Sequence, residues 1–142
     1  MGNTELPLPI RKRLERIEIS LSRLEEIRKI SLKDFINDWK SQDISLRNFQ
    51  IAVESCLDIG TYIISRSDAP VPDTYTEIVK TLRKLKVIDE DLESEFIKMV
   101  RFRNIIVHEY LYIDFNKVYE NLRNLSFFRN FARKVIDYIK KF

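Results

Sequence analysis

The sequence predicts an all-α fold, a bundle of four or five antiparallel helices, and three observations support this prediction. Only two glycines and four prolines occur in 142 residues, so few positions allow the tight turns of a many-stranded β-fold. Leu, Ile, Glu, Lys and Arg dominate the composition, and most of them favour helices. Apolar residues also recur at steps of three and four along most of the chain, which is the spacing of helices that bury one face.

The size and composition predict a single domain over residues 1–142, because 44% hydrophobic residues are enough for one core. The net charge is only +3, so any affinity for phosphate must come from a local cluster of cations. The single cysteine, Cys56, lies in an apolar run and cannot form an internal disulfide, which favours a buried thiol and a cytoplasmic location. No signal peptide and no apolar run of roughly 18 residues is present, so we expect no membrane span.

The N-terminal half of the chain predicts three helices. Apolar residues at helical steps place the first helix over about residues 10–30. Ser31 is suited to cap a short second helix, and Asp43 or Ser45 begins a longer one that ends near Ser65. The run "SDAPVPD" then breaks the chain.

The C-terminal half predicts two further helices and the segment that carries the candidate site. Thr74 and Glu77 form a capping box for a helix that ends near Lys86. Asp89 begins the helix that contains "RFRNIIVHEY". An apolar stripe then predicts one long last helix over residues 118–142.

Arg103 is the anomalous residue of this segment, because it falls in the middle of a broad apolar helical face. That face consists of Phe96, Met99, Val100, Phe102, Ile106, Val107 and Tyr110. A guanidinium keeps its charge and is costly to bury alone, so Arg103 needs a carboxylate, an opening in a neighbouring subunit or a ligand phosphate. One interpretation is purely structural: the arginine pairs with Glu54 or Asp58 in an ordinary bundle.

Three further polar side chains are predicted to lie near Arg103. Asn104 and His108, the only histidine, are four residues apart and therefore neighbours on the helix, where the amide can hold one ring nitrogen. Tyr110 follows Arg103 by seven residues and lies almost above it if the helix continues that far. The four side chains are therefore expected to converge on one spot.

At these residues the sequence resembles a known family. "RNIIVHEY" is similar to the R-N-x-x-V-H-x-Y form of the Arg-x4–6-His signature of HEPN domains, and specifically of the HepT-like toxins of prokaryotic toxin–antitoxin pairs. The resemblance extends to "LKDFINDW", "LRNFQIAVESCLDIGTYIISR", "DTYTEIVKTLRKLKVIDEDL" and "IDFNKVYENL", and so covers about residues 10–125.

The resemblance implies a helical bundle that dimerises, with metal-independent ribonuclease activity at a cleft lined by both copies of the motif. It also implies a partner, an antitoxin of the minimal nucleotidyltransferase type, MntA, which can adenylylate the motif tyrosine. Carried over residue by residue, Arg103 and His108 are the catalytic pair, Asn104 is the supporting polar residue and Tyr110 is the modification target. Glu109 fills a variable position and receives no role.

The chemistry of the side chains agrees with this interpretation. RNA cleavage without a metal needs a base for the 2′-hydroxyl proton and a cation for the phosphorane; imidazole, which titrates near pH ~6.5, and guanidinium suit these tasks. One histidine per chain cannot be both base and acid, which favours a two-fold dimer. No metal-ligand spacing is recognisable, so we expect neither metal nor cofactor. The alternative is a non-catalytic helical module that binds nucleotide or a partner, with Tyr110 as a regulatory acceptor.

Overall fold

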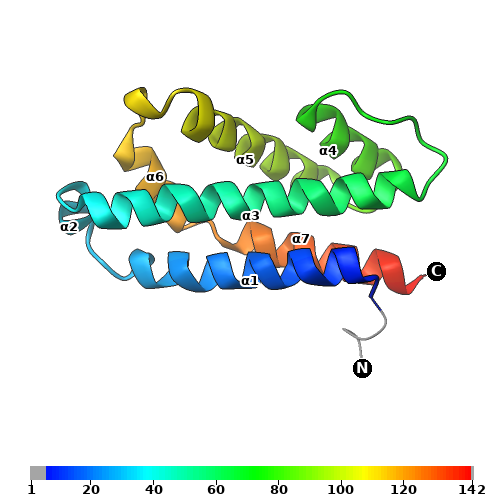
Figure 1. The fold of residues 1–142 in the computed structure, drawn as a ribbon, viewed down its shortest axis with the longest axis horizontal. Helices are drawn as coiled ribbons and strands as arrows, with labels where there is room; N and C mark the ends of the chain where they lie inside the picture. Colours follow the sequence, from blue (N-terminus) through cyan, green and yellow to red (C-terminus); the bar gives the residue numbers. More distant parts are fainter. Residues whose placement is uncertain (1–5, 142) are drawn as a thin grey trace.

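The computed structural model describes residues 6–141, and all of the regular structure in this range is helical. In chain order the elements are α1 (Leu8–Arg28), α2 (Leu32–Ile36), α3 (Trp39–Ser65), α4 (Tyr75–Lys84), α5 (Glu90–His108), the 3-10 turn η2 (Tyr110–Tyr112), α6 (Phe115–Leu122) and α7 (Ser126–Lys140). The predicted all-α fold is confirmed. Four long helices, α1, α3, α5 and α7, make the bundle, and the short helices close its ends and edges (Figure 1).

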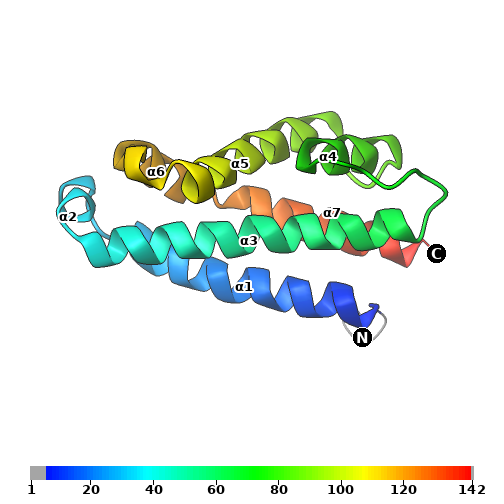
Figure 2. The ribbon, with the colours of Figure 1, turned by 45° about the horizontal axis from the view of Figure 1, so that its top comes forward.

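The two longest helices, α1 and α3, run antiparallel and lie side by side in both views of the ribbon (Figures 1 and 2). Helices α4 and α5 pack along the other side of α3, and α7 passes behind. The start of α1 and the end of α7 lie at the same end of the bundle, and the end of α5 lies at the opposite end (Figure 1). The motif helix therefore carries its C-terminal residues away from both chain ends.

Buried apolar side chains of the described residues form one cluster at the centre of the bundle. Phe96 of α5 packs against Phe127 and Phe131 of α7, with ring centroids 5.3 and 5.2 Å apart. Phe102 of α5 meets Phe49 of α3 edge to face at 5.0 Å. These aromatic contacts fix α5 between α3 and α7.

Three predicted helix caps are confirmed. The side chains of Ser31, Thr74 and Asp89 each accept a hydrogen bond from the backbone N–H three residues later, at 3.1, 3.1 and 2.9 Å. Each bond satisfies one of the amides that the first turn of a helix leaves unpaired. These residues therefore begin α2, α4 and α5.

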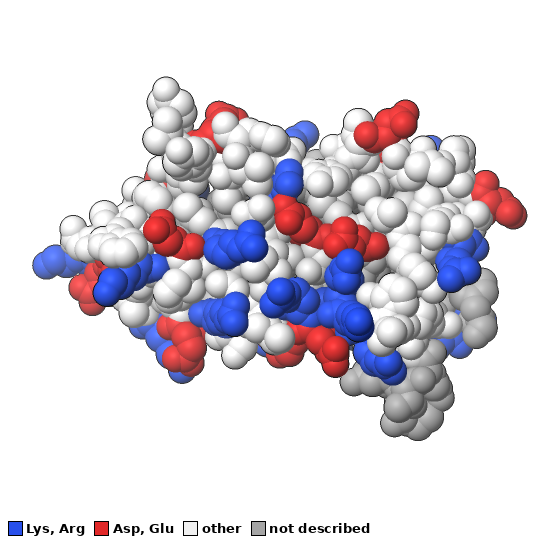
Figure 3. All heavy atoms as spheres, viewed as in Figure 1, with Lys and Arg blue, Asp and Glu red and all other residues white. Residues whose placement is uncertain are grey.

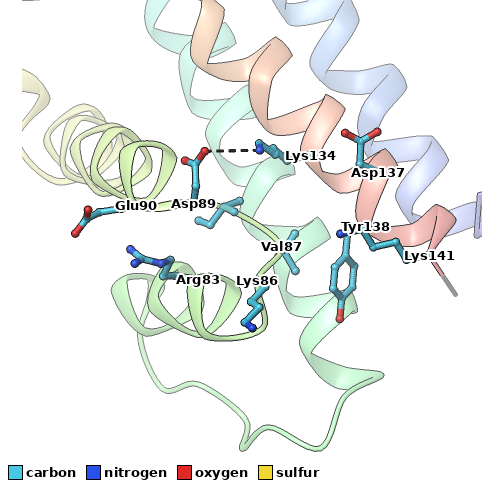
Figure 4. A pocket seen from close by; sticks show the side chains of 10 residues that line it. Arg83, Lys86, Val87, Asp89, Glu90, Lys134, Asp137, Tyr138 and Lys141 are labelled. Atoms are coloured by element: carbon cyan, nitrogen blue, oxygen red, sulfur yellow. Dashed lines mark ion pairs between the residues drawn. The ribbon is translucent and has the colours of Figure 1, made fainter.

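Asp89 also connects the start of the motif helix to α7. Its carboxylate lies 3.6 Å from Lys134 Nζ, across a cleft that is lined by side chains of both charges (Figure 4). The hydrogen bond from the Leu92 amide, together with Lys134, lowers the pKa of the Asp89 carboxyl. The first turn of α5 is thus fixed both by its cap and by a neighbouring helix.

Two predicted boundaries were wrong. Helix α3 begins at Trp39, capped by Asp38, and not at Asp43 or Ser45. The predicted single last helix over 118–142 is divided, because α6 ends at Leu122 and α7 begins at Ser126. Most of the apolar stripe is nevertheless buried on both sides of the break, and only Ala132 and Ile139 are half-buried. The predicted spacing of the stripe is therefore correct, although the predicted continuous helix is not. Phe142 lies outside the described residues.

Two smaller features complete the bundle. Cys56 is fully buried, as predicted, and burial raises the pKa of its thiol well above the ordinary value. Gly60 lets α4 approach α3 closely, because a Cβ at this position would lie 2.8 Å from Ile78 Cγ2. Within residues 6–141 no helix has the length and apolarity needed to cross a membrane.

Candidate active site

Arg103 is anchored to α3 by Glu54. Its Nε and Nη2 both donate to Glu54 Oε2, at 2.9 and 2.7 Å, and Gln50 Nε2 donates to the same oxygen at 3.2 Å. Only 13% of the arginine side chain is exposed, against 32% of the glutamate side chain. The structure thus gives the mostly buried guanidinium the carboxylate partner that its charge requires. Of the two partners considered from the sequence it selects Glu54, since Asp58 pairs with Arg13 at 2.9 Å.

Two more groups fix the plane of the guanidinium. Arg103 Nη1 donates to Asn104 Oδ1 at 3.2 Å, and Arg103 Cζ lies 5.0 Å from the centroid of the Tyr75 ring. A guanidinium has five N–H donors. Glu54 and Asn104 accept from three of them, which leaves one N–H on each of the two terminal nitrogens. Arg103 therefore keeps two donors for an anion such as a phosphate.

Asn104 does not hold the histidine as the sequence suggested. Its carbonyl oxygen accepts from Arg103, and no hydrogen bond joins it to His108 among the residues that the structure describes. His108 is the last residue of α5, and its side chain is exposed.

Tyr110 does not lie above Arg103 on the same helix, so this expectation was wrong. Helix α5 ends at His108, and Glu109 leaves the helical conformation with φ −133° and ψ 33°. Tyr110 then begins the 3-10 turn η2 and is 67% exposed. The motif therefore divides into an anchored part on α5 and a projecting part on η2.

The projecting part and the end of α5 carry exposed apolar side chains, defined here as the η2 surface. This surface consists of Ile105 of α5 and of Tyr110, Leu111 and Tyr112 of η2, which are 41%, 67%, 76% and 83% exposed. In Figure 3 the projection at the upper left, where Figure 1 places η2, has no lysine, arginine or acidic side chain at its tip. Apolar side chains this exposed at the end of a motif are typical of a surface that another protein covers.

The described residues contain no group of three or more His, Cys, Asp and Glu side chains that are placed to hold a metal ion. Near the motif, Glu54 already accepts from Arg103 and Gln50. The motif itself carries the arginine fork, the exposed imidazole and the tyrosine hydroxyl.

Sequence reasoning missed one member of the site, Tyr75. It lies on α4, 28 positions before Arg103 by the numbering, directly after the helix cap Thr74. Nothing in the spacing of residues around a helix cap marks an aromatic ring as the partner of a distant arginine. Only the packing of α4 on α3, which Gly60 permits, brings the ring to the guanidinium.

Known proteins resemble this chain in both sequence and fold. A tRNA nuclease HepT of Aphanizomenon flos-aquae is 32% identical over 119 residues, which cover 84% of this chain and 80% of the relative. An mRNA nuclease HepT of Shewanella oneidensis is 32% identical over 76 residues, 54% of this chain and 57% of the relative. The fold also matches a solved structure, a tri-AMPylated HEPN toxin of Shewanella oneidensis in complex with MNT antitoxin. That match has a TM-score of 0.86 at 24% identity and covers 92% of this chain and 98% of the toxin.

A family model also matches most of the chain. Residues 17–135 match the family described as Ribonuclease HepT-like, and this range includes every helix of the bundle at least in part. It contains Glu54, Tyr75 and the whole motif from Arg103 to Tyr110. The resemblance seen in the sequence is thus confirmed, and the chain belongs to the HepT-like ribonuclease family.

Proposed function

We propose that this protein is the RNA-cleaving toxin of a toxin–antitoxin pair and that Arg103 and His108 are its catalytic residues. The observation that carries the proposal is the fixed arginine fork, which keeps two donors free and lies five residues before an exposed imidazole on the same helix. The relatives named as tRNA and mRNA nucleases support RNA as the substrate. The solved toxin of the same fold, in complex with MNT antitoxin, supports the partner.

The proposed reaction is an internal transesterification that needs no metal ion. The 2′-oxygen of a ribose attacks the adjacent phosphorus, His108 takes the 2′-hydroxyl proton, and the bond from phosphorus to the 5′-oxygen breaks. The two remaining N–H groups of Arg103 donate to the phosphorane oxygens, where negative charge develops. The departing 5′-oxygen needs a proton, which a protonated imidazole supplies.

We further propose that a two-fold dimer supplies the second imidazole. One chain has only one histidine, whereas two copies around a two-fold axis bring two motifs to one cleft. The η2 surface adjoins His108 and offers exposed apolar area for this contact. Burial of Leu111 and Tyr112 between copies removes them from water and favours association.

The proposed antitoxin is an MntA-like nucleotidyltransferase that transfers AMP from ATP to Tyr110. The phenolic oxygen attacks the α-phosphorus of ATP, the phenolic proton is lost and pyrophosphate leaves. Exposure of the Tyr110 side chain supports this role, because an enzyme must reach its hydroxyl. The added phosphate brings negative charge and bulk to the rim of the cleft and blocks RNA.

A second candidate function is a non-catalytic module that binds nucleotide or a partner protein. The ion pair between Arg103 and Glu54 favours it, because a satisfied arginine has a structural role even without RNA. In this alternative Tyr110 is a regulatory acceptor. His108 then has no chemical task.

Induced expression with and without the cognate nucleotidyltransferase tests the proposal. We expect growth arrest and degraded RNA when the protein is expressed alone, and normal growth with intact RNA when the partner is present. The control is the His108→Ala variant, which should not arrest growth at the same protein level. Arrest by that variant equal to that of the unaltered protein would favour the non-catalytic module.

A further inference from the structure

A groove of about 310 Å³ lies between α1 and α3. Its walls carry Lys12, Arg13, Arg16, Arg47, Ile51, Glu54, Ser55 and Asp58. We define this set as the α1–α3 groove. Because α1 and α3 lie antiparallel and side by side, residues from the first half of α1 face the middle of α3 (Figure 2).

The helical spacing of these residues explains why they line one groove. On α3, Arg47, Ile51, Glu54 and Asp58 follow one another at steps of four, three and four, which is a single stripe along the helix. On α1, the three cations Lys12, Arg13 and Arg16 lie within two turns of the helix. The stripe presents a polar face because the opposite face of α3 is buried in the core.

Both carboxylates of the groove are already neutralised. Glu54 accepts from Arg103, and Asp58 accepts from Arg13 at 2.9 Å. Lys12, Arg16 and Arg47 are exposed, and the structure gives none of them an ion pair or a hydrogen bond through its side chain within residues 6–141. The groove therefore has three cations whose charge is not compensated by a contact.

The groove concentrates the charge of the whole protein. Together with Arg103 it holds five cations and two carboxylates, a formal charge of +3, and the complete chain also has +3. The formal charges of all the remaining residues therefore sum to zero. Figure 3 shows lysine and arginine side chains crowded over the middle of α1 and α3, with acidic side chains beside them.

We infer that the α1–α3 groove binds the phosphate backbone of the RNA substrate and leads it to Arg103. Glu54 connects the two places, since it lines the groove and holds the catalytic arginine. Two of the three uncompensated cations are arginines, whose planar fork matches phosphate oxygens. This inference rests on the proposed function, because it assigns the path of that same substrate.

RNA fits the groove better than a protein partner does. Protein interfaces are anchored by buried aromatic or apolar side chains, whereas the only large apolar residue in this groove is the half-buried Ile51. Cations without compensating carboxylates instead favour a polyanion, whose bound counterions are released on association. The groove is therefore distinct in character from the apolar η2 surface.

The test measures RNA affinity as a function of salt. A mixed-sequence single-stranded RNA oligonucleotide is titrated with the full chain carrying His108→Ala, which prevents cleavage, and fluorescence anisotropy is recorded over a salt series. The groove variant adds Arg16→Gln and Arg47→Gln. The matched control adds Arg28→Gln and Lys84→Gln. These substitutions remove the same net charge, but at two exposed cations outside the groove. Circular dichroism confirms that both variants stay helical.

We expect the groove variant to bind about tenfold or more weakly at ~0.1 M salt. The slope of log K against log salt should fall by about 1.4, roughly 0.7 for each phosphate that the variant no longer neutralises. The control should stay within about twofold of the parent. The inference would be overturned if the groove variant bound RNA with the same affinity and the same salt slope as the parent. It would also be overturned if the groove variant lost affinity for the antitoxin alone and not for RNA. If the unaltered chain fails to cleave RNA, the proposed function fails, whatever the groove binds.

Discussion

Glu54 of α3 and Arg103 of α5 are joined through a single carboxylate oxygen, although they are 49 positions apart in the sequence. Both Nε and Nη2 of the arginine donate to Glu54 Oε2, at 2.9 and 2.7 Å. Asn104 accepts one further hydrogen bond from Nη1, and the ring of Tyr75 lies 5.0 Å from Arg103 Cζ. The ion pair thus compensates the charge of the mostly buried guanidinium and fixes the orientation of its two free N–H groups.

The first prediction concerns the role of Glu54 as a positioning residue. Glu54→Ala should lower kcat for RNA cleavage about tenfold or more, because the guanidinium of Arg103 is no longer held in a fixed orientation. It should not raise KM, because the substitution removes a negative charge that repels RNA. It should also lower the free energy of unfolding by about 1–3 kcal/mol, since Arg103 loses its charged acceptor. Steady-state kinetics and urea denaturation at fixed protein concentration measure the two effects.

The control for this prediction is Glu25→Ala on α1, whose pair with Arg129 lies outside the α1–α3 groove. The two side chains are 42% and 47% exposed, so its loss should cost less than about 1 kcal/mol and leave kcat unchanged. If Glu54→Ala matched Glu25→Ala in kcat, the pair of Glu54 with Arg103 would be structural only. A rise in KM alone would assign Glu54 to binding.

The second prediction concerns the dimer. Leu111→Asp places a charge on the η2 surface, where the side chain is 76% exposed, and should convert dimers to monomers without unfolding the bundle. Light scattering at micromolar concentration should report about twice 17.1 kDa for the unaltered chain and 17.1 kDa for the variant. Val71→Asp is the control, because Val71 is 84% exposed in the loop before α4 and should leave the dimer intact. Dimers of Leu111→Asp would exclude η2 from the interface.

The third prediction concerns Tyr110. Incubation with the cognate nucleotidyltransferase, ATP and Mg²⁺ should add AMP to the unaltered chain and none to Tyr110→Phe, which intact-mass spectrometry detects. Tyr112→Phe is a close control, because it removes a hydroxyl from the same turn at 83% exposure and should still be modified. Tyr110→Phe should remain toxic in the presence of the partner. Its neutralisation without any mass change would mean that the antitoxin acts by binding alone.

The fourth prediction concerns the pH dependence of stability through Asp89. The pKa of this carboxyl is lowered by the amide of Leu92 and by Lys134, so its contribution is present above the ordinary pKa and is lost as pH falls through the lowered value. Asp89→Ala should therefore lower the free energy of unfolding at pH 7 by about 1 kcal/mol and have a smaller effect at pH 3. Denaturant titration at the two pH values measures this. The control, Asp91→Ala, removes an exposed carboxylate that caps nothing. An equal effect of Asp89→Ala at both pH values would exclude an ionised cap.

The helices could largely be predicted from the sequence because their caps are local. Ser31, Thr74 and Asp89 each accept from an amide three residues on, and this geometry depends on few neighbours. The predicted start of α3 was wrong because several residues between Asp38 and Ser45 are able to cap a helix, and packing selects one of them. The break after Leu122 escaped prediction because the apolar stripe stays in step across it.

The candidate site was only partly predictable for a related reason. The sequence identifies Arg103 as a charge that needs a partner, but Glu54 and Asp58 lie on one stripe of α3, and only the register of α5 against α3 selects between them. The position of Tyr110 depended on where α5 ends, and neither glycine nor proline marks that end. Tyr75 could not be found at all, since its contact exists only in the folded packing.

The central claim, that His108 and Arg103 cleave RNA without a metal ion, is tested most directly by one cleavage assay. Purified protein is incubated with RNA and excess EDTA, and the unaltered chain is compared with His108→Ala and with Glu109→Ala, an exposed neighbour to which no role is assigned. We predict cleavage by the unaltered chain and by Glu109→Ala, and loss of about 10²-fold or more in rate for His108→Ala with unchanged helicity. Arg103→Lys should be similarly inactive, because an ammonium lacks the planar fork. Undiminished cleavage by His108→Ala, or cleavage by the unaltered chain that EDTA abolishes, would contradict the account.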